Sequence, residues 1–156
     1  MVLAIQSREL YIGYEVEESA ALWIVEKLGI EVEHKTTFCL IGESGCGKST
    51  IGNAIAGLLP PYARARGQLV IFDKIVIDGD KRFFDGVRGK IIVKIPQDPA
   101  SSLNPFMTIG RQLSLAMSLP RPRAFIITTK GIFPGTAGND ICNVPSLCLS
   151  RITGIL

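Results

Sequence analysis

The sequence predicts an α/β fold in which a buried strand, a glycine-rich loop and a helix follow one another early in the chain. An apolar run at residues 37–41 is typical of a buried strand. Residues 42–50 then read Gly-Glu-Ser-Gly-Cys-Gly-Lys-Ser-Thr, which matches the pattern G-x-x-x-x-G-K-S/T in full. Four apolar residues after this loop recur at the spacing of one helix face: Ile51, Ala54, Ile55 and Leu58.

The loop carries the residue types that bind phosphate groups. Its glycines allow backbone angles that a side chain would forbid, so its N–H groups can turn inward at the positive end of the helix. Lys48 can reach the outer phosphates, Ser49 can offer a hydroxyl to Mg²⁺, and Thr50 can add a hydroxyl near the inner phosphates. A chance glycine-rich turn would not need the flanking strand and helix. We predict a phosphate site of nine residues: Gly42, Glu43, Ser44, Gly45, Cys46, Gly47, Lys48, Ser49 and Thr50.

Length and composition indicate one globular domain. The chain has 156 residues, of which 47% are apolar and 20% are charged. The formal net charge of +3 is too small to indicate a nucleic-acid partner. Glutamates interrupt any signal-peptide core near the N-terminus, and no apolar stretch is long enough to span a bilayer. We therefore expect any role at a membrane to depend on a partner.

The four cysteines favour a reduced, cytosolic protein over a disulfide framework. They form no C-x-x-C pair, and two of them, Cys39 and Cys46, fall in the predicted strand and in the phosphate loop. The other two are Cys142 and Cys148. We expect a thiol reagent to reach Cys46 and bound nucleotide to protect it.

Before the loop, the pattern predicts strands at residues 2–6 and 9–14, followed by an acidic turn at 15–21. Residues 22–28 are ambiguous because their local propensity favours a helix. Residues 30–33 alternate as in a strand, and the segment lies just before the loop strand, so we expect a strand over 22–33.

After the loop, Pro60-Pro61 should end the helix, since proline cannot continue its hydrogen bonds. We expect a basic loop at residues 62–66 and strands at 69–72, 75–77 and 91–95. Thr108 should cap a further helix whose apolar face is formed by Ile109, Leu113, Ala116 and Met117.

The character of the sequence changes at Pro120. Glycine and proline are scattered without period, and no apolar periodicity persists beyond the short run at residues 124–129. We therefore expect one domain over residues 1–119 and an atypical tail over 120–156 that is poorly ordered or irregularly packed.

A second motif gives the chain a family resemblance. Residues 97–105 read Gln-Asp-Pro-Ala-Ser-Ser-Leu-Asn-Pro, and 107–110 read Met-Thr-Ile-Gly. Together with the loop, they resemble the Q-loop region of ABC transporter ATP-binding subunits, in the branch that serves peptide and nickel importers. The similarity covers about residues 2–119. It implies a P-loop NTPase core with an antiparallel β subdomain.

The resemblance implies several site residues. Tyr14 falls where the family has an aromatic side chain that stacks on adenine, although a plain strand residue is the alternative. The nine loop residues match the family's Walker A positions. Gln97 matches a glutamine that contacts Mg²⁺ and water, so the implied catalytic residues are Lys48 and Gln97, and the implied metal ligands are Ser49 and Gln97. The resemblance also implies that Phe106 and Met107 lie near the groove that receives a helix of the membrane subunit, with core packing as the alternative.

The resemblance also implies cofactors and partners. The cofactors would be ATP and Mg²⁺, and ATP would drive import of peptides (or nickel). The partners would be transmembrane permease subunits and a second ATP-binding subunit. They would hold the chain in the cytoplasm, on the inner face of the cell membrane.

Three family elements are missing from the sequence: an LSGGQ-type signature, an apolar strand ending in Asp-Glu, and a switch histidine downstream. We therefore expect a chain truncated before its helical subdomain is complete, which binds Mg-nucleotide and hydrolyses it poorly. Alternatives are a P-loop remnant that binds nucleotide without hydrolysis or does not fold, and a small P-loop kinase or GTPase. No Asn-Lys-x-Asp guanine motif supports a GTPase.

Overall fold

The computed structural model describes residues 2–17, 20–96, 98, 100–118, 124–127 and 148–152. The chain divides into two compact units. The first comprises Met1–Phe83 together with Thr136–Leu156, and the second comprises Phe84–Gly135. In the described residues, no helix is long and apolar enough to cross a membrane.

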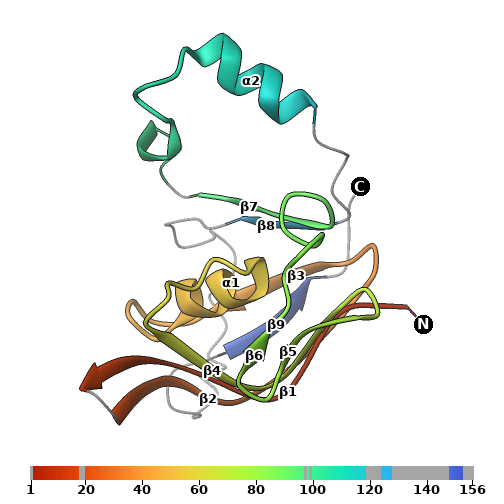
Figure 1. Cartoon of the computed structure of the whole chain (residues 1–156). Helices are drawn as coiled ribbons and strands as arrows, with labels where there is room; N and C mark the ends of the chain where they lie inside the picture. Colours follow the sequence, from red (N-terminus) through yellow and green to blue (C-terminus); the bar gives the residue numbers. More distant parts are fainter. Residues whose placement is uncertain are drawn as a thin grey trace. The chain divides into compact units, whose positions relative to one another are not determined.

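The first unit contains a five-stranded antiparallel sheet, drawn in red to green in Figure 1. Its spatial order is β2-β1-β4-β5-β6. The strands are β1 Leu3–Glu17, β2 Ala20–Glu33, β4 Ala63–Ile71, β5 Lys74–Asp78 and β6 Lys81–Arg82. Leu10, Ile12, Leu69 and Ile77 are fully buried and form part of its core. The antiparallel β region implied by the resemblance is thus present.

Strand β1 corrects the prediction of two strands at residues 2–6 and 9–14. The strand runs unbroken, but Glu9 has a φ of +43° and the register against β4 shifts between Arg8 and Tyr11. A β-bulge of this kind inserts an extra residue and interrupts the alternation seen in the sequence. Gly67 lies opposite, where a Cβ atom would overlap the backbone oxygen of Glu9.

Two other predictions for this sheet were wrong. The basic loop predicted at residues 62–66 is largely strand, because β4 begins at Ala63 with alternating buried alanines and exposed arginines. There Arg64 donates a hydrogen bond to Glu15 at 2.8 Å, and this bond raises the pKa of the Arg64 guanidinium. The turn predicted at 15–21 is shorter, since β1 continues to Glu17 and β2 begins at Ala20. The strand predicted over 22–33 is confirmed.

The first unit also holds strand β3, Thr37–Ile41, and helix α1, Lys48–Ala56, which lies over one face of the sheet (Figure 1). β3 is half-buried rather than fully buried and pairs antiparallel with β9, Cys148–Ile152. Helix α1 ends before the predicted Pro60-Pro61, because Gly57 adopts a φ of +69° and closes the helix. Leu58 consequently lies beyond the helix and is exposed.

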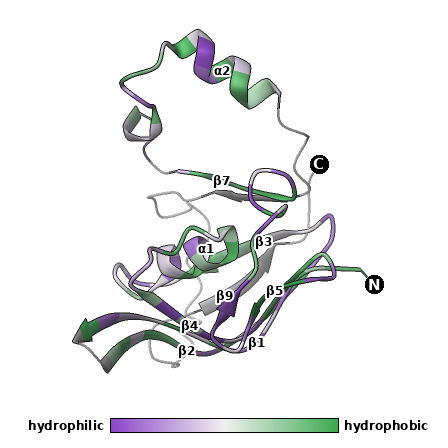
Figure 2. Cartoon of the chain, viewed as in Figure 1, coloured by the Kyte–Doolittle hydropathy of each residue, from purple (hydrophilic) through white to green (hydrophobic). Residues whose placement is uncertain are grey.

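The second unit contains the parallel strands β7, Ile92–Ile95, and β8, Ala124–Ile127, with the short 3₁₀ helix η1, Ala100–Ser102, and helix α2, Ile109–Met117. Its buried apolar residues include Phe84, Val87 and Ile92. The predicted strand at 91–95 and the predicted helix after Thr108 are confirmed. Green and purple alternate along α2 in Figure 2, as expected of an amphipathic helix. Of the predicted tail, only β8 and β9 are within the described residues.

Candidate phosphate-binding site

The loop between β3 and α1 has the backbone that its glycines predict at two positions. Gly45 has a φ of +88° and Gly47 a φ of +92°, in the left-handed region that favours glycine. Gly42 lies outside that region, so the prediction fails there. A Cβ atom on Gly47 would also come within 3.1 Å of Val25 and 3.2 Å of Ile24, both on β2. The sheet therefore leaves no room for a side chain at position 47.

The first turn of α1 is open to an anionic ligand. Gly47 occupies the N-cap position and has no side chain to accept a hydrogen bond from the helix amides, and the first turn carries no acidic residue. The helix itself is regular here, since the Ile51 N–H donates to the Gly47 carbonyl at 2.9 Å. The first N–H groups of a helix lack partners within it, and the helix dipole makes this end positive. Such an end suits a phosphate group.

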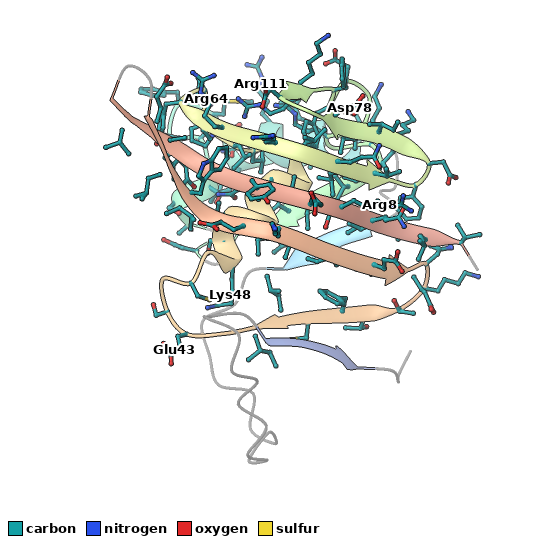
Figure 3. All side chains as sticks on the ribbon, turned by 90° about the horizontal axis from the view of Figure 1, so that it is seen from below. Arg8, Glu43, Lys48, Arg64, Asp78 and Arg111 are labelled. Atoms are coloured by element: carbon teal, nitrogen blue, oxygen red, sulfur yellow. The ribbon has the colours of Figure 1, made fainter. Side chains whose placement is uncertain are left out.

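Lys48 supplies a full positive charge beside this helix end (Figure 3). Its ammonium donates to the backbone oxygens of Gly42, at 2.7 Å, and of Glu43. It also lies 3.3 Å from the sulfur of Cys46. The lysine side chain therefore curls over its own loop. Carbonyl oxygens are weaker partners for an ammonium than a charged phosphate oxygen, so this lysine can exchange them for a ligand.

The hydroxyl residues of the loop differ in their surroundings. Ser49 is exposed, whereas Thr50 is half-buried, with its Oγ1 3.2 Å from the hydroxyl of Tyr14 on β1. The Tyr14 ring in turn lies 6.0 Å from the ring of Tyr62, measured between centroids, at an interplanar angle of 44°. The structure thus brings the Tyr14 hydroxyl next to the phosphate loop, and the contact of its ring with adenine remains a prediction.

Not every predicted site residue can be placed. Gln97 lies outside the described residues, so its catalytic and Mg²⁺-binding roles remain predictions. Glu43, Ser44 and Gly45 are exposed on the loop. Within the described ranges, no group of three or more His, Cys, Asp or Glu side chains could hold a metal ion by itself. A Mg²⁺ ion here would need phosphate oxygens to complete its shell.

Sequence reasoning missed Tyr62, because it fell in the segment predicted as a basic loop. Its backbone is tied to β1, since the Glu15 N–H donates to the Tyr62 carbonyl at 3.0 Å. A sequence signal was present in the aromatic residue directly after Pro60-Pro61, but nothing local to it indicates that Tyr14 is its neighbour.

Comparison with known proteins agrees with this geometry. The profile of a family described as "ABC transporter" matches residues 25–140, a range that contains the whole loop and β3. The match extends beyond residue 119, the end of the predicted domain, whose boundary remains a prediction. This family implies the P-loop NTPase fold and ATP binding.

Individual relatives point the same way. The chain is 42% identical over 83 residues to the dipeptide transport ATP-binding protein DppD of Bacillus subtilis, covering 52% of this chain and 25% of DppD. It is 35% identical over 99 residues to the oligopeptide transport ATP-binding protein OppD of Mycobacterium bovis, covering 64% of this chain and 16% of OppD. It is 33% identical over 153 residues to the uncharacterized ABC transporter ATP-binding protein YejF of Escherichia coli, covering 97% of this chain and 26% of YejF.

The chain spans about a quarter or less of the length of these relatives. The family profile, by contrast, matches well over half of the chain and includes both the glycine loop and the helix that follows it. The chain therefore belongs to the ABC transporter family.

Proposed function

We propose that this chain binds Mg-ATP at the N-terminal end of α1, as part of the ATP-binding component of a peptide importer. The observation that carries the proposal is the loop itself, in which Gly45 and Gly47 have positive φ and an uncapped helix end lies beside Lys48. A curled backbone, a positive helix end and a lysine together form a site for a chain of phosphates.

The loop residues up to Ser49, together with Tyr14 and Gln97, each have a place in this proposal. The backbone of residues 42–47 surrounds the outer phosphates, and Lys48 exchanges the carbonyls of Gly42 and Glu43 for phosphate oxygens. Ser49 and Gln97 bind the Mg²⁺ ion, and Tyr14 contacts the adenine. An exposed Ser49 hydroxyl suits a metal that retains several water ligands.

The names of the relatives support a peptide as the transported solute. DppD is named for dipeptide transport and OppD for oligopeptide transport. Import would require permease subunits in the membrane and a second ATP-binding subunit. These partners would hold the chain at the cytoplasmic face of the membrane. Nickel, the other solute implied by the resemblance, is the alternative.

Phosphoryl transfer to water requires charge neutralisation, a placed metal and an oriented water. The loop supplies the first and part of the second, and Gln97 contributes to the third. The 156 residues contain neither an LSGGQ-type signature nor an apolar strand ending in Asp-Glu. We therefore expect this chain by itself to bind Mg-ATP and to hydrolyse it slowly.

Thermal unfolding with Mg-ATP tests the proposal. A ligand present at a hundred times its Kd stabilises the folded state by about 2.7 kcal/mol, so the Tm should rise. Lys48→Ala should abolish most of the rise, because it removes a charge-assisted hydrogen bond to phosphate. Lys74→Ala is the matched control, since Lys74 is an exposed lysine on β5.

Three outcomes would contradict the proposal or its details. A folded chain whose Tm does not respond to Mg-ATP would refute nucleotide binding. An equal rise in Tm with Mg-ATP for Lys48→Ala and Lys74→Ala would refute the placement of the nucleotide beside Lys48. A larger response to Mg-GTP than to Mg-ATP would favour the GTPase alternative, and rapid ATP turnover lost in Lys48→Ala would refute slow hydrolysis.

A further inference from the structure

The hydroxyls of Tyr14 and Thr50 form a hydrogen bond between the sheet and the first turn of α1. The two oxygens are 3.2 Å apart, and the residues are 36 positions apart in the sequence. Thr50 is the third residue of α1 and belongs to the glycine-loop motif. The bond therefore connects the strand predicted to carry the base-contacting ring with the loop predicted to carry the phosphates.

The direction of this hydrogen bond decides what Thr50 can do. Either oxygen can be the donor, because each hydroxyl carries one proton and also accepts. If Thr50 donates to Tyr14, its only proton is used. If Tyr14 donates to Thr50, the Thr50 proton remains available for another acceptor. A phosphate oxygen only accepts, so a bound nucleotide would select the second direction.

We propose that Tyr14 is a positioning residue whose hydroxyl donates to Thr50 and so directs the Thr50 proton toward the innermost phosphate of the nucleotide. This inference rests on the proposed function and goes beyond it. It gives Tyr14 a role in phosphate binding through its hydroxyl, in addition to any contact between its ring and the base.

The structure holds both partners in place for this role. Tyr14 is paired on both sides, with Leu22 of β2 and Ala63 of β4. The Tyr62 ring packs beside its ring at 6.0 Å. Thr50 is held by the helix, whose following residue Ile51 is buried. Both side chains are half-buried and stand on paired or helical backbone, so less conformational entropy is lost when they meet a ligand than for exposed side chains.

Variants of the two hydroxyls test the proposal. In the full chain, Tyr14→Phe keeps the ring and removes the donor, and Thr50→Val removes the hydroxyl that it directs. Each should weaken Mg-ATP binding by about threefold to tenfold, the usual value of one hydrogen bond. The double variant should bind Mg-ATP no more weakly than Thr50→Val does, because the two residues act through one hydrogen bond. Thr50→Ser, which keeps a hydroxyl, should bind like the wild type.

A second ligand separates the phosphate role from the base role. Mg-tripolyphosphate carries phosphates and no base. Tyr14→Phe should therefore weaken the binding of Mg-tripolyphosphate by the same factor as the binding of Mg-ATP. Tyr11→Phe is the matched control, because Tyr11 is on the same strand and its ring packs on Trp23 at 5.9 Å. It should leave both affinities unchanged. The Tm of each variant without ligand shows that the fold is intact.

The proposal is overturned if Tyr14→Phe binds Mg-ATP like the wild type, if the losses of the two single variants multiply in the double variant, or if tripolyphosphate binding is unaffected. Those results would leave the proposed function standing as long as the wild type binds Mg-ATP and Lys48→Ala does not. A wild-type chain that binds neither ligand refutes both proposals.

Discussion

The two α-helices in the described residues have the same length but differ in how far they are buried. α1 and α2 each have nine residues. Five residues of α1 are buried, whereas none of α2 is. α2 begins at a Thr108 cap whose hydroxyl accepts from the Arg111 N–H at 3.4 Å, whereas α1 begins at Gly47, which has no side chain. The helix that is well covered leaves its N-terminal end open, and the exposed helix closes its own.

This difference indicates how each helix is stabilised. Packing against the sheet stabilises α1, so its first turn does not need a cap of its own and can receive a ligand. α2 has less packing, so its cap carries a larger share of its stability. The predictions below test this contrast.

The largest effect should come from the buried face of α1. Ile51 is 1% exposed, so Ile51→Ala should lower the free energy of unfolding by about 2–5 kcal/mol, through lost apolar contact and the cavity left behind. Leu113→Ala on α2 is the matched control. Leu113 is 58% exposed, and its removal should cost less than about 0.5 kcal/mol. Chemical denaturation measures both, and equal costs would contradict the contrast.

Replacing a glycine by alanine should have opposite effects on stability at Gly47, the N-cap of α1, and at Gly110, within α2. Gly47→Ala forces a φ of +92° on an L-residue and brings a Cβ against Val25 and Ile24, so it should cost at least about 1–2 kcal/mol. At Gly110 in α2, a Cβ would meet nothing within 4 Å. Gly110→Ala should therefore stabilise the helix by up to about 1 kcal/mol. The Tm of the two variants measures both effects, and a Gly47→Ala variant as stable as the wild type would contradict the positive φ at Gly47.

The cap of α2 should have a smaller effect than the buried face of α1. Thr108→Ala removes the acceptor of the Arg111 N–H and should destabilise α2 by about 1 kcal/mol. Amide hydrogen exchange should then speed up at Arg111 and Gln112 and stay unchanged in α1. Ser114→Ala, in the middle of the same helix, serves as the control. Unchanged exchange at Arg111 would mean that the cap does not stabilise α2.

The sequence predicted those parts whose signals are local. The order of β3, loop and α1 follows from one apolar run, one motif and one helical spacing, and the Thr108 cap follows from one residue before an apolar face. The bulge at Glu9 could not be predicted in this way, because it depends on Gly67, which is far away in the sequence. The early end of α1 had a local signal in Gly57 that the proline pair obscured.

The candidate site also has some features that local sequence signals predict and others that depend on residues far apart in the sequence. Positive φ at Gly45 and Gly47 and the position of Lys48 follow from the motif, whose geometry is set by neighbours in the sequence. The contact of Tyr14 with Thr50 and the nearby Tyr62 ring depend on the pairing of β1 with β4. Strand register is not encoded locally, so the sequence could suggest Tyr14 only through a family resemblance.

The most direct test of the central claim follows the amide signals of both helix ends by NMR during titration with Mg-ATP. If the open end of α1 binds phosphates, the signals of Gly45, Gly47, Lys48 and Ser49 should shift with saturation, while those of Arg111 and Gln112 behind the Thr108 cap should not. A natively folded chain whose loop signals do not move, or whose α2 signals move instead, would contradict the account.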